Sequence, residues 1–257
     1  LHVSGTGWGA YGHFLVSPQV GTLVADTAGH DSPHSEDVTR PYYYSTFLDR
    51  YQTQVEIAPA HYSAMYRFTF PKAEEAGLLF DASQAIPTDI ERNMNGKVLE
   101  SSAQIDMETG KMRMKITYRG GWVNGPYSLY MVVQYNKKAT EVGVWCGDSL
   151  YADQTVIQND TSARGKHIGV YCKFDTDKKE KVLLKLAISF TGYDRAEALL
   201  EQEIPEWSFE NVERQGKQIW EEKFRRIEIE GATWEQNVMF YSAMFRFYTL
   251  ASDRTLD

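Results

Sequence analysis

The stretch Lys111–Tyr118, KMRMKITY, indicates the class of fold most clearly. Apolar and polar side chains alternate along it, which predicts a β-strand with one buried face. The residues expected to face the core are Met112, Met114, Ile116 and Tyr118, and those expected to face away are Arg113, Lys115 and Thr117. A plausible hairpin turn, Glu108–Lys111, comes directly before this strand.

Similar strand patterns extend to both sides of this stretch. The further predicted strands are His13–Val20, Tyr51–Pro59, Ser63–Phe70, Ser128–Gln134, His167–Phe174 and Lys181–Phe190. Turn signals such as Asn95-Gly96 and Asn124-Gly125-Pro126 separate them, and no helical pattern intervenes. We therefore expect a mainly β fold, a large antiparallel sandwich. Val24–Arg40 is expected to be a long loop.

The period of the apolar residues changes near Asp194. This aspartate is expected to cap a short helix that runs through Glu203. Ser208 is expected to cap a longer helix through Ile227, with Val212, Ile219, Trp220, Phe224 and Ile227 on its apolar face.

A last helix is predicted over Thr233–Ala251, TWEQNVMFYSAMFRFYTLA. Thr233 and Gln236 have the spacing of a capping box. The helix is apolar on nearly every side, which predicts that it is buried. Only a few residues follow it, up to Asp257. We therefore expect that the helical layer that would bury it is missing from the chain, and that the start at Leu1, which is not Met, is cut or processed.

Composition excludes several classes of function. The net charge of −8 disfavours a nucleic-acid partner, and no apolar run is long enough to span a bilayer. The aromatic content of 13% suits a sheet-rich core. Cys146 and Cys172 are too few for a disulfide framework; they either pair across neighbouring strands or remain free buried thiols.

Several polar side chains are candidates for a functional site. His30, Asp31, His34, Glu36 and Asp37 crowd the predicted loop, where a metal site and a solvated loop are both open and the solvated loop is favoured. The acidic side chains Asp26, Asp31, Glu36, Asp37, Asp81 and Asp89 are expected to be solvated, and Trp122, Trp145 and Tyr193 are expected to lie in the core. The sequence marks no pair of carboxylates and no nucleophile elbow, so it supplies no candidate catalytic residue.

Four segments carry a resemblance to a known family. They are HVSGTGWGAYG from His2, HSEDVTRPYYYSTFL over His34–Leu48, EIAPAHYSAMYRFTFP over Glu56–Pro71, and the long tail Leu183–Tyr248. In this order they resemble family 92 of the glycoside hydrolases, the exo-acting α-mannosidases. Two positions depart from the family pattern. Tyr42 stands where a glycine is usual, and Arg246 stands where the first barrel helix usually carries a histidine.

The resemblance implies a β-supersandwich over residues 1–192 that is incomplete at its start, a helical linker over 193–231, and the first helix of a truncated (α/α)6 barrel over 232–257. It also implies a calcium-dependent, inverting enzyme whose acid, base and most calcium ligands lie in the barrel. This chain is therefore expected to hold no catalytic residue, metal ligand or cofactor of its own.

The candidate substrate-binding residues are His2, Ser4, Gly5, Thr6, Gly7 and Trp8, followed by His34 and Glu36 through the resemblance. Glycines allow close approach of backbone amides to a sugar hydroxyl, and a tryptophan offers a flat apolar face. The alternative is a structural turn with a core tryptophan, and a solvated loop for His34 and Glu36.

The expected function is that of the non-catalytic N-terminal part of a calcium-dependent, inverting exo-α-mannosidase, which scaffolds the barrel and lines the sugar pocket. Its expected partners are a mannose-containing glycan and the C-terminal (α/α)6 catalytic domain, in the periplasm or outside the cell. The alternatives are a stand-alone carbohydrate-binding sandwich without activity, and a structural half that pairs with a separately encoded helical protein.

Overall fold

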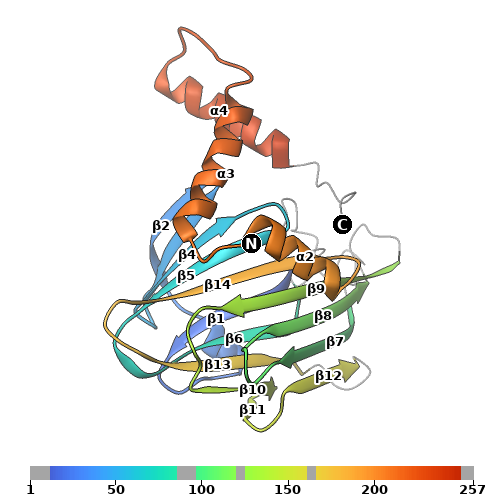
Figure 1. Cartoon of the computed structure of the whole chain (residues 1–257). Helices are drawn as coiled ribbons and strands as arrows, with labels where there is room; N and C mark the ends of the chain where they lie inside the picture. Colours follow the sequence, from blue (N-terminus) through green and yellow to red (C-terminus); the bar gives the residue numbers. More distant parts are fainter. Residues whose placement is uncertain (1–11, 86–96, 120–124, 161–165, 250–257) are drawn as a thin grey trace.

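The chain folds into two antiparallel β-sheets that pack face to face, followed by helices (Figure 1). The computed structural model describes residues 12–85, 97–119, 125–160 and 166–249. Within these residues the nine-stranded sheet has the spatial order β12 (Val156–Asp160), β7 (Lys97–Ile105), β8 (Met112–Arg119), β9 (Pro126–Tyr135), β14 (Glu180–Ser189), β5 (Ser63–Phe70), β4 (Thr53–Pro59), β3 (Tyr43–Leu48) and β2 (His34–Arg40). The five-stranded sheet has the order β1 (His13–Val20), β6 (Ala73–Ala85), β13 (Ile168–Thr176), β10 (Glu141–Cys146) and β11 (Ser149–Tyr151). The predicted antiparallel sandwich is thus confirmed.

The last strands along the chain occupy central places in both sheets. β14 lies between β9 and β5 and pairs with both of them. In the same way, β13 lies between β6 and β10. Neighbouring strands are therefore often far apart in sequence.

The strand over residues 111–118 forms as predicted, as β8. The side chains of Met112, Met114, Ile116 and Tyr118 are buried, and the first three pack in the core between the sheets with Leu78 and Phe80 of β6. The preceding turn is closed by Asp106, whose Oδ1 accepts the amides of Glu108 (2.9 Å) and Thr109 (2.7 Å). Gly110 in this turn has φ 69°, a conformation that favours glycine.

The predicted loop over residues 24–40 is wrong over most of its length. It contains the short helix α1 (Thr27–His30) and the edge strand β2. Most side chains of β2 are exposed on both faces, so the strand has no alternation of apolar residues to reveal it. Hydrogen-bonded pairing with β3 forms the strand, and a bulge lies between Ser35 and Val38.

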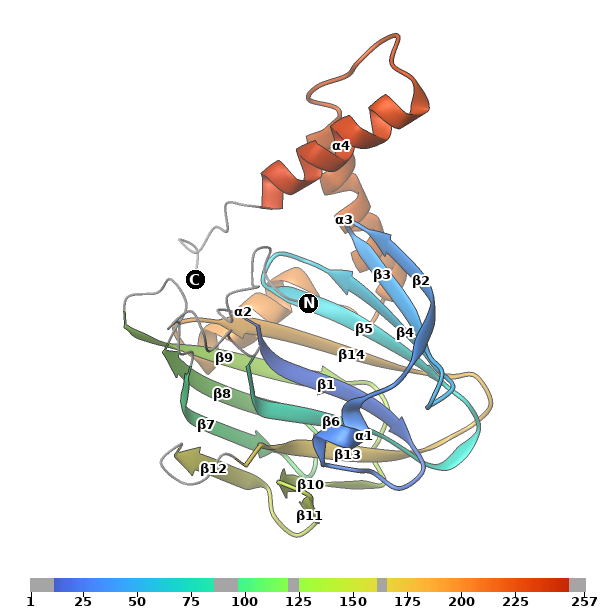
Figure 2. The same cartoon turned by 180° about the vertical axis from the view of Figure 1, so that it is seen from behind.

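Three helices follow the sandwich: α2 (Tyr193–Glu203), α3 (Phe209–Phe224) and α4 (Trp234–Thr249). α2 lies across β14 and β9, α3 rises from β4 and β5, and α4 crosses the far end of α3 (Figures 1 and 2). A second apolar cluster joins the outer face of the nine-stranded sheet to the helices; it includes Met65, Val132 and Ala187 from strands and Leu200, Phe209 and Val212 from the helical region.

Two of the predicted helix caps are confirmed. Ser208 Oγ accepts the amide of Asn211 at 3.3 Å. Thr233 and Gln236 form the capping box, with Thr233 N donating to Gln236 Oε1 (2.8 Å) and Gln236 N donating to Thr233 Oγ1 (3.3 Å). The cap predicted at Asp194 is wrong, because the helix begins one residue earlier and its N-cap, Gly192, has no side chain to accept a hydrogen bond.

α4 forms as predicted, but it is not buried among the described residues. Phe245 and Tyr241 pack against Trp220 (centroids 5.1 Å apart) and Phe224 (5.9 Å) of α3. Away from α3, Trp234 is 75% exposed, and Met239 and Phe247 are both 73% exposed. The predicted apolar face of α3 is only partly covered too, since Ile219 and Ile227 are exposed.

The remaining predictions on the fold concern cysteines, tryptophan and membrane spans. Cys146 and Cys172 lie on neighbouring strands but are out of register, opposite Ile168 and Val142, and both are free thiols. Trp145 is fully buried, as predicted. Among the residues that the structure describes, no helix is both long and apolar enough to cross a membrane.

Candidate functional site

The sequence-predicted sugar-contact residues divide into two groups. His2, Ser4, Gly5, Thr6, Gly7 and Trp8 lie outside the described residues, as do Trp122 and Asp89. Their proposed roles stay predictions.

His34 and Glu36 are described, and both lie on the edge strand β2. The His34 Nδ1 atom is 2.8 Å from Asp37 Oδ2, with both side chains solvent-exposed. Glu36 has φ 55° at the bulge of the strand. Across the described ranges, no three His, Cys, Asp or Glu side chains are grouped so as to hold a metal ion. His34 and Glu36 thus lie on an exposed edge strand.

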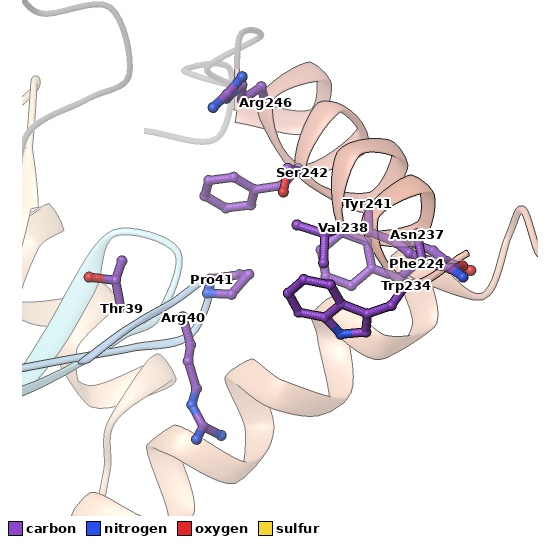
Figure 3. A pocket seen from close by; sticks show the side chains of 11 residues that line it. Thr39, Arg40, Pro41, Phe224, Trp234, Asn237, Val238, Tyr241, Ser242 and Arg246 are labelled. Atoms are coloured by element: carbon purple, nitrogen blue, oxygen red, sulfur yellow. The ribbon is translucent and has the colours of Figure 1, made fainter. Parts of the chain in front are cut away.

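The strand β2 leads to a cleft of about 560 Å³ between the sandwich and the helices (Figure 3). Its lining comes from the turn between β2 and β3 and from α3 and α4, and comprises Thr39, Arg40, Pro41, Phe224, Trp234, Asn237, Val238, Tyr241, Ser242, Phe245 and Arg246. We call it the junction cleft. Most of its wall is aromatic or aliphatic, with a few polar groups among them.

The polar groups of the junction cleft are spread along it. Figure 3 shows Arg40 and Arg246 at opposite ends, with guanidinium groups that do not converge on one point. Arg40 Nη1 donates to the hydroxyl of Tyr42 at 3.3 Å. Asn237 and Ser242 stand on α4 between Trp234 and Phe245. An apolar wall with separated hydrogen-bonding groups can pack against the C–H face of a ligand and orient its hydroxyls.

A network of charged side chains fixes the start of α3 on the sheet, and thereby one wall of the cleft. Arg67 on β5 donates from Nε to Glu56 Oε2 (2.6 Å) and from Nη1 to Glu210 Oε1 (2.5 Å). Its guanidinium also lies 4.2 Å from the ring centroid of Phe209. Burial alone would raise the pKa of Glu56, but the hydrogen bonds from Arg67 and Tyr43 outweigh it and hold that pKa below its ordinary value.

The turn between β2 and β3 meets α3 at a glycine. A Cβ atom on Gly216 would lie 3.1 Å from the Cβ of Tyr42 and 3.5 Å from the carbonyl oxygen of Pro59. The missing side chain therefore lets the helix approach the turn closely. Tyr42 is one of the two residues at which the sequence departs from the pattern of the family that it resembles.

Asp81 was predicted to be solvated, and this is wrong. The side chain has no exposed surface and accepts hydrogen bonds from the amide (2.8 Å) and hydroxyl (2.9 Å) of Ser83, while its Oδ2 lies 2.5 Å from His167 Nδ1. The hydrogen bond with Asp81 raises the pKa of His167. Asp81 belongs to the same face of β6 as Leu79, outside the main core.

His30 of α1 completes this environment (Figure 2 shows α1 beside β1). Its ring meets Trp145 edge-on at 6.0 Å, and its buried Nε2 has no hydrogen-bond partner among the described residues. Burial lowers the pKa of His30, although the negative charge of Asp81 acts to raise it. The sequence signal that could have marked Asp81 is the apolar run around it, GLLFDA, which indicates a strand buried on both faces.

Comparison with known proteins assigns both parts of the chain. Residues 1–189 match the family model described as the glycosyl hydrolase family 92 N-terminal domain, and residues 195–256 match that of the family 92 catalytic domain. The junction cleft combines residues 39–41 from the first segment with residues 224–246 from the second. No curated protein that was searched matches the chain.

Solved structures of the family share this fold. The family GH92 alpha-mannosidase BT3965 from Bacteroides thetaiotaomicron has a TM-score of 0.78 at 19% identity, with 91% of this chain and 31% of that chain covered. The GH92 inverting mannosidase BT2199 from Bacteroides thetaiotaomicron VPI-5482 has a TM-score of 0.77 at 24% identity, covering 91% and 29%. The GH92 glycosyl hydrolase ccman5 has a TM-score of 0.77 at 21% identity, covering 95% and 33%.

This chain therefore spans about a third of the length of the solved structures it matches. Nearly three quarters of its residues fall in the N-terminal domain match, and the helices α2, α3 and α4 begin the catalytic-domain match or lie within it. The chain belongs to glycosyl hydrolase family 92.

Proposed function

We propose that this chain is the non-catalytic N-terminal part of an inverting, calcium-dependent exo-α-mannosidase that acts on mannose-containing glycans. The observation that carries the proposal is the junction cleft, which is lined by Thr39, Arg40 and Pro41 of the first family segment and by an aromatic wall from the second. Two structural relatives are mannosidases by name, and one of them is an inverting mannosidase.

In this proposal the sandwich lines the sugar-binding pocket and supplies no catalytic residue. An inverting glycosidase needs an acid and a base carboxylate roughly 6.5–9.5 Å apart. Calcium takes six or more oxygen ligands, chiefly carboxylates and carbonyls. The described residues include no group of three or more acidic, histidine or cysteine side chains that suits a metal. From the family resemblance, we assign the acid, the base and most of the calcium ligands to the helical catalytic domain.

The chain's own residues then bind and orient the sugar. Trp234, Tyr241 and Phe245 offer apolar faces in the junction cleft, and Asn237 and Arg246 offer donors. We keep His2, Ser4, Gly5, Thr6, Gly7 and Trp8 as the proposed sugar-contact turn, and His34 and Glu36 as the next candidates, on the strand that leads to the cleft.

The exposed side of α4 is the proposed contact with the rest of the helical domain. Trp234, Met239 and Phe247 give it a large apolar surface, which a stand-alone module would not keep in water. Because α4 lies within the match to the catalytic-domain model, the proposed occupant is the rest of that domain, as further helices of an (α/α)6 barrel. We place the whole protein in the periplasm or outside the cell.

The test compares two proteins with an aryl α-mannoside as substrate. The purified chain of residues 1–257 is expected to give no turnover. The full product of the gene that encodes this sequence is expected to hydrolyse the mannoside with inversion of the anomeric centre, followed by NMR, and to lose activity when calcium is chelated. Turnover by the chain alone would contradict the non-catalytic role, and an inactive gene product would contradict the mannosidase assignment.

A further inference from the structure

A second groove lies on α3, apart from the junction cleft. It has a volume of about 490 Å³ and is bounded by α3, the end of α2, and the turn between β4 and β5. Pro59, Ile219 and Trp220 supply apolar lining, and His61, Gln202 and Gln215 supply polar lining. Ile219 is 54% exposed, so this apolar lining is open to solvent.

The groove is built on a rigid frame. The Glu203 carboxylate, at the end of α2, accepts the backbone amides of Tyr62 (3.0 Å) and Ser63 (3.0 Å) and the Ser63 hydroxyl, which ties α2 to the turn. The ring of His61 packs edge-on against Tyr62 with centroids 4.5 Å apart. The ring of Trp220 packs against Phe245 of α4 with ring centroids 5.1 Å apart. A preformed site loses little conformational entropy when a ligand binds.

The two groups in the lining that carry a full charge are engaged outside the groove. Glu203 is satisfied by the turn, as described above. Lys223 Nζ lies over the ring of Tyr248 at 5.0 Å. What the groove presents is therefore an apolar platform beside amide and imidazole groups. This chemistry fits a neutral ligand with an apolar C–H face and several hydroxyls, which is a pyranose.

We propose that this groove binds neutral sugar units of a glycan chain, with the sugar ring on Ile219 and Trp220 and its hydroxyls on Gln215 and His61. The inference rests on the proposed function, because it takes a glycan as the ligand. It adds a holding site for the polymer to a protein whose proposed sugar contacts lie in the junction cleft and the glycine-rich turn.

The test uses the chain of residues 1–257 and linear α-linked mannotriose, with cellotriose as a second neutral sugar. Binding is measured by calorimetry and mapped by NMR on the side-chain amides. Gln215→Ala and His61→Ala are each expected to weaken binding about fivefold, since one lost hydrogen bond is worth about 1 kcal/mol. The matched control is Gln218→Ala, an exposed glutamine of the same helix that lies outside the groove and should leave binding unchanged.

The outcomes separate this inference from the proposed function. The proposal that the groove binds sugar would be overturned if neither sugar binds. It would also be overturned if Gln215→Ala and His61→Ala leave binding unchanged. Binding of cellotriose alone, weakened by both variants, would support the groove while opposing mannose as its ligand. Hydrolysis by the full gene product tests the proposed function, and its failure would not alter the effect of the groove variants on binding.

Discussion

Asp81 is a carboxylate that is fully buried. A carboxylate without exposed surface is costly to bury unless it is paired and hydrogen-bonded, and Asp81 has His167 and Ser83 as partners. Ser83 Oγ in turn accepts the amide of Ile168 at 3.0 Å. The network therefore joins the end of β6 to the beginning of β13 through side-chain hydrogen bonds, in addition to the backbone hydrogen bonds between the two strands.

Removing the Asp81 carboxylate should be strongly destabilising. Asp81→Ala leaves the Ser83 and His167 donors buried or half-buried without an acceptor, so we expect the free energy of unfolding to fall by about 3 kcal/mol. Asp81→Asn should cost less, because its amide oxygen still accepts from Ser83. Urea denaturation followed by tryptophan fluorescence measures both. Asp175→Ala, at an exposed position of β13, is the control, and an equal loss there would contradict the argument.

His167 should make stability depend on pH in a defined direction. Its pKa is raised in the folded state above the ordinary value of about 6.5, mainly by the hydrogen bond with Asp81. Its contribution to stability is therefore fully present below about pH 6.5 and is lost as pH rises through the folded-state pKa.

The measurement is the difference in unfolding free energy between the parent protein and His167→Ala across pH 5 to pH 9. This difference should be largest at the acid end and shrink towards alkaline pH. In the Asp81→Asn background the difference should be nearly flat. A difference that grows with pH would contradict the role of Asp81.

Single residues show where sequence reasoning succeeds and where it stops. Trp145 was placed in the core by its type alone, and the structure agrees. The type of Asp81 predicts that it is solvated, and the structure disagrees, because the carboxylate is paired with His167, which lies 86 residues further along the chain. A sequence pattern contains information only on a side chain and its neighbours along the chain. Whether a charged side chain is buried depends on a partner that is distant in sequence.

At the scale of elements, strands with one buried face could be predicted and exposed strands could not. The alternating stretch over residues 111–118 became β8, with the apolar positions inside. The edge strand β2 is exposed on nearly all its residues, and only its pairing with β3 makes it a strand. Helix starts were predicted well where a side chain caps them, as at Ser208 and Thr233.

The contact between α3 and the β2–β3 turn depends on Gly216, which suggests a double-mutant cycle. An alanine in a helix is favoured over glycine by about 1 kcal/mol, but at this position its Cβ would press on Tyr42. We expect Gly216→Ala to stabilise the protein in the Tyr42→Gly background and to give little or no gain in the parent.

Thermal or urea unfolding of the parent, both single variants and the double variant gives the interaction between the two sites, which should be about 1 kcal/mol. Gln218→Ala on the same helix controls for propensity alone. Equal effects of Gly216→Ala in both backgrounds would show that Tyr42 is not the residue that limits this position.

For the whole molecule, the fold class could be predicted and the candidate site only in part. Alternation and turn signals are enough to predict an antiparallel sandwich followed by helices. The junction cleft joins Arg40 to Arg246, and such a meeting of distant segments has no local signature. The predicted glycine-rich turn lies outside the described residues, so its place relative to the cleft stays a prediction.

The sandwich should require its last strand. Because β14 pairs with both β9 and β5, a chain that ends after Asp177 would leave each of those two strands with an open edge in the middle of the nine-stranded sheet. We expect such a shortened protein to lose the cooperative urea transition and to bind a hydrophobic dye. A chain ending after Thr191, which keeps β14 and lacks the helices, is the comparison; it should retain a cooperative transition at lower stability. A cooperative transition in the shorter protein would contradict the central role of β14.

The same central position of β14 has a consequence for synthesis on the ribosome. The chain emerges from its N-terminus, so β4, β5, β8 and β9 are all made before the strand that joins them. Until β14 leaves the exit tunnel, two half-sheets remain with open edges and uncovered apolar faces, which favours association with chaperones or with other nascent chains. Closure of the sandwich therefore waits until the chain has been made beyond the end of β14 at Ser189.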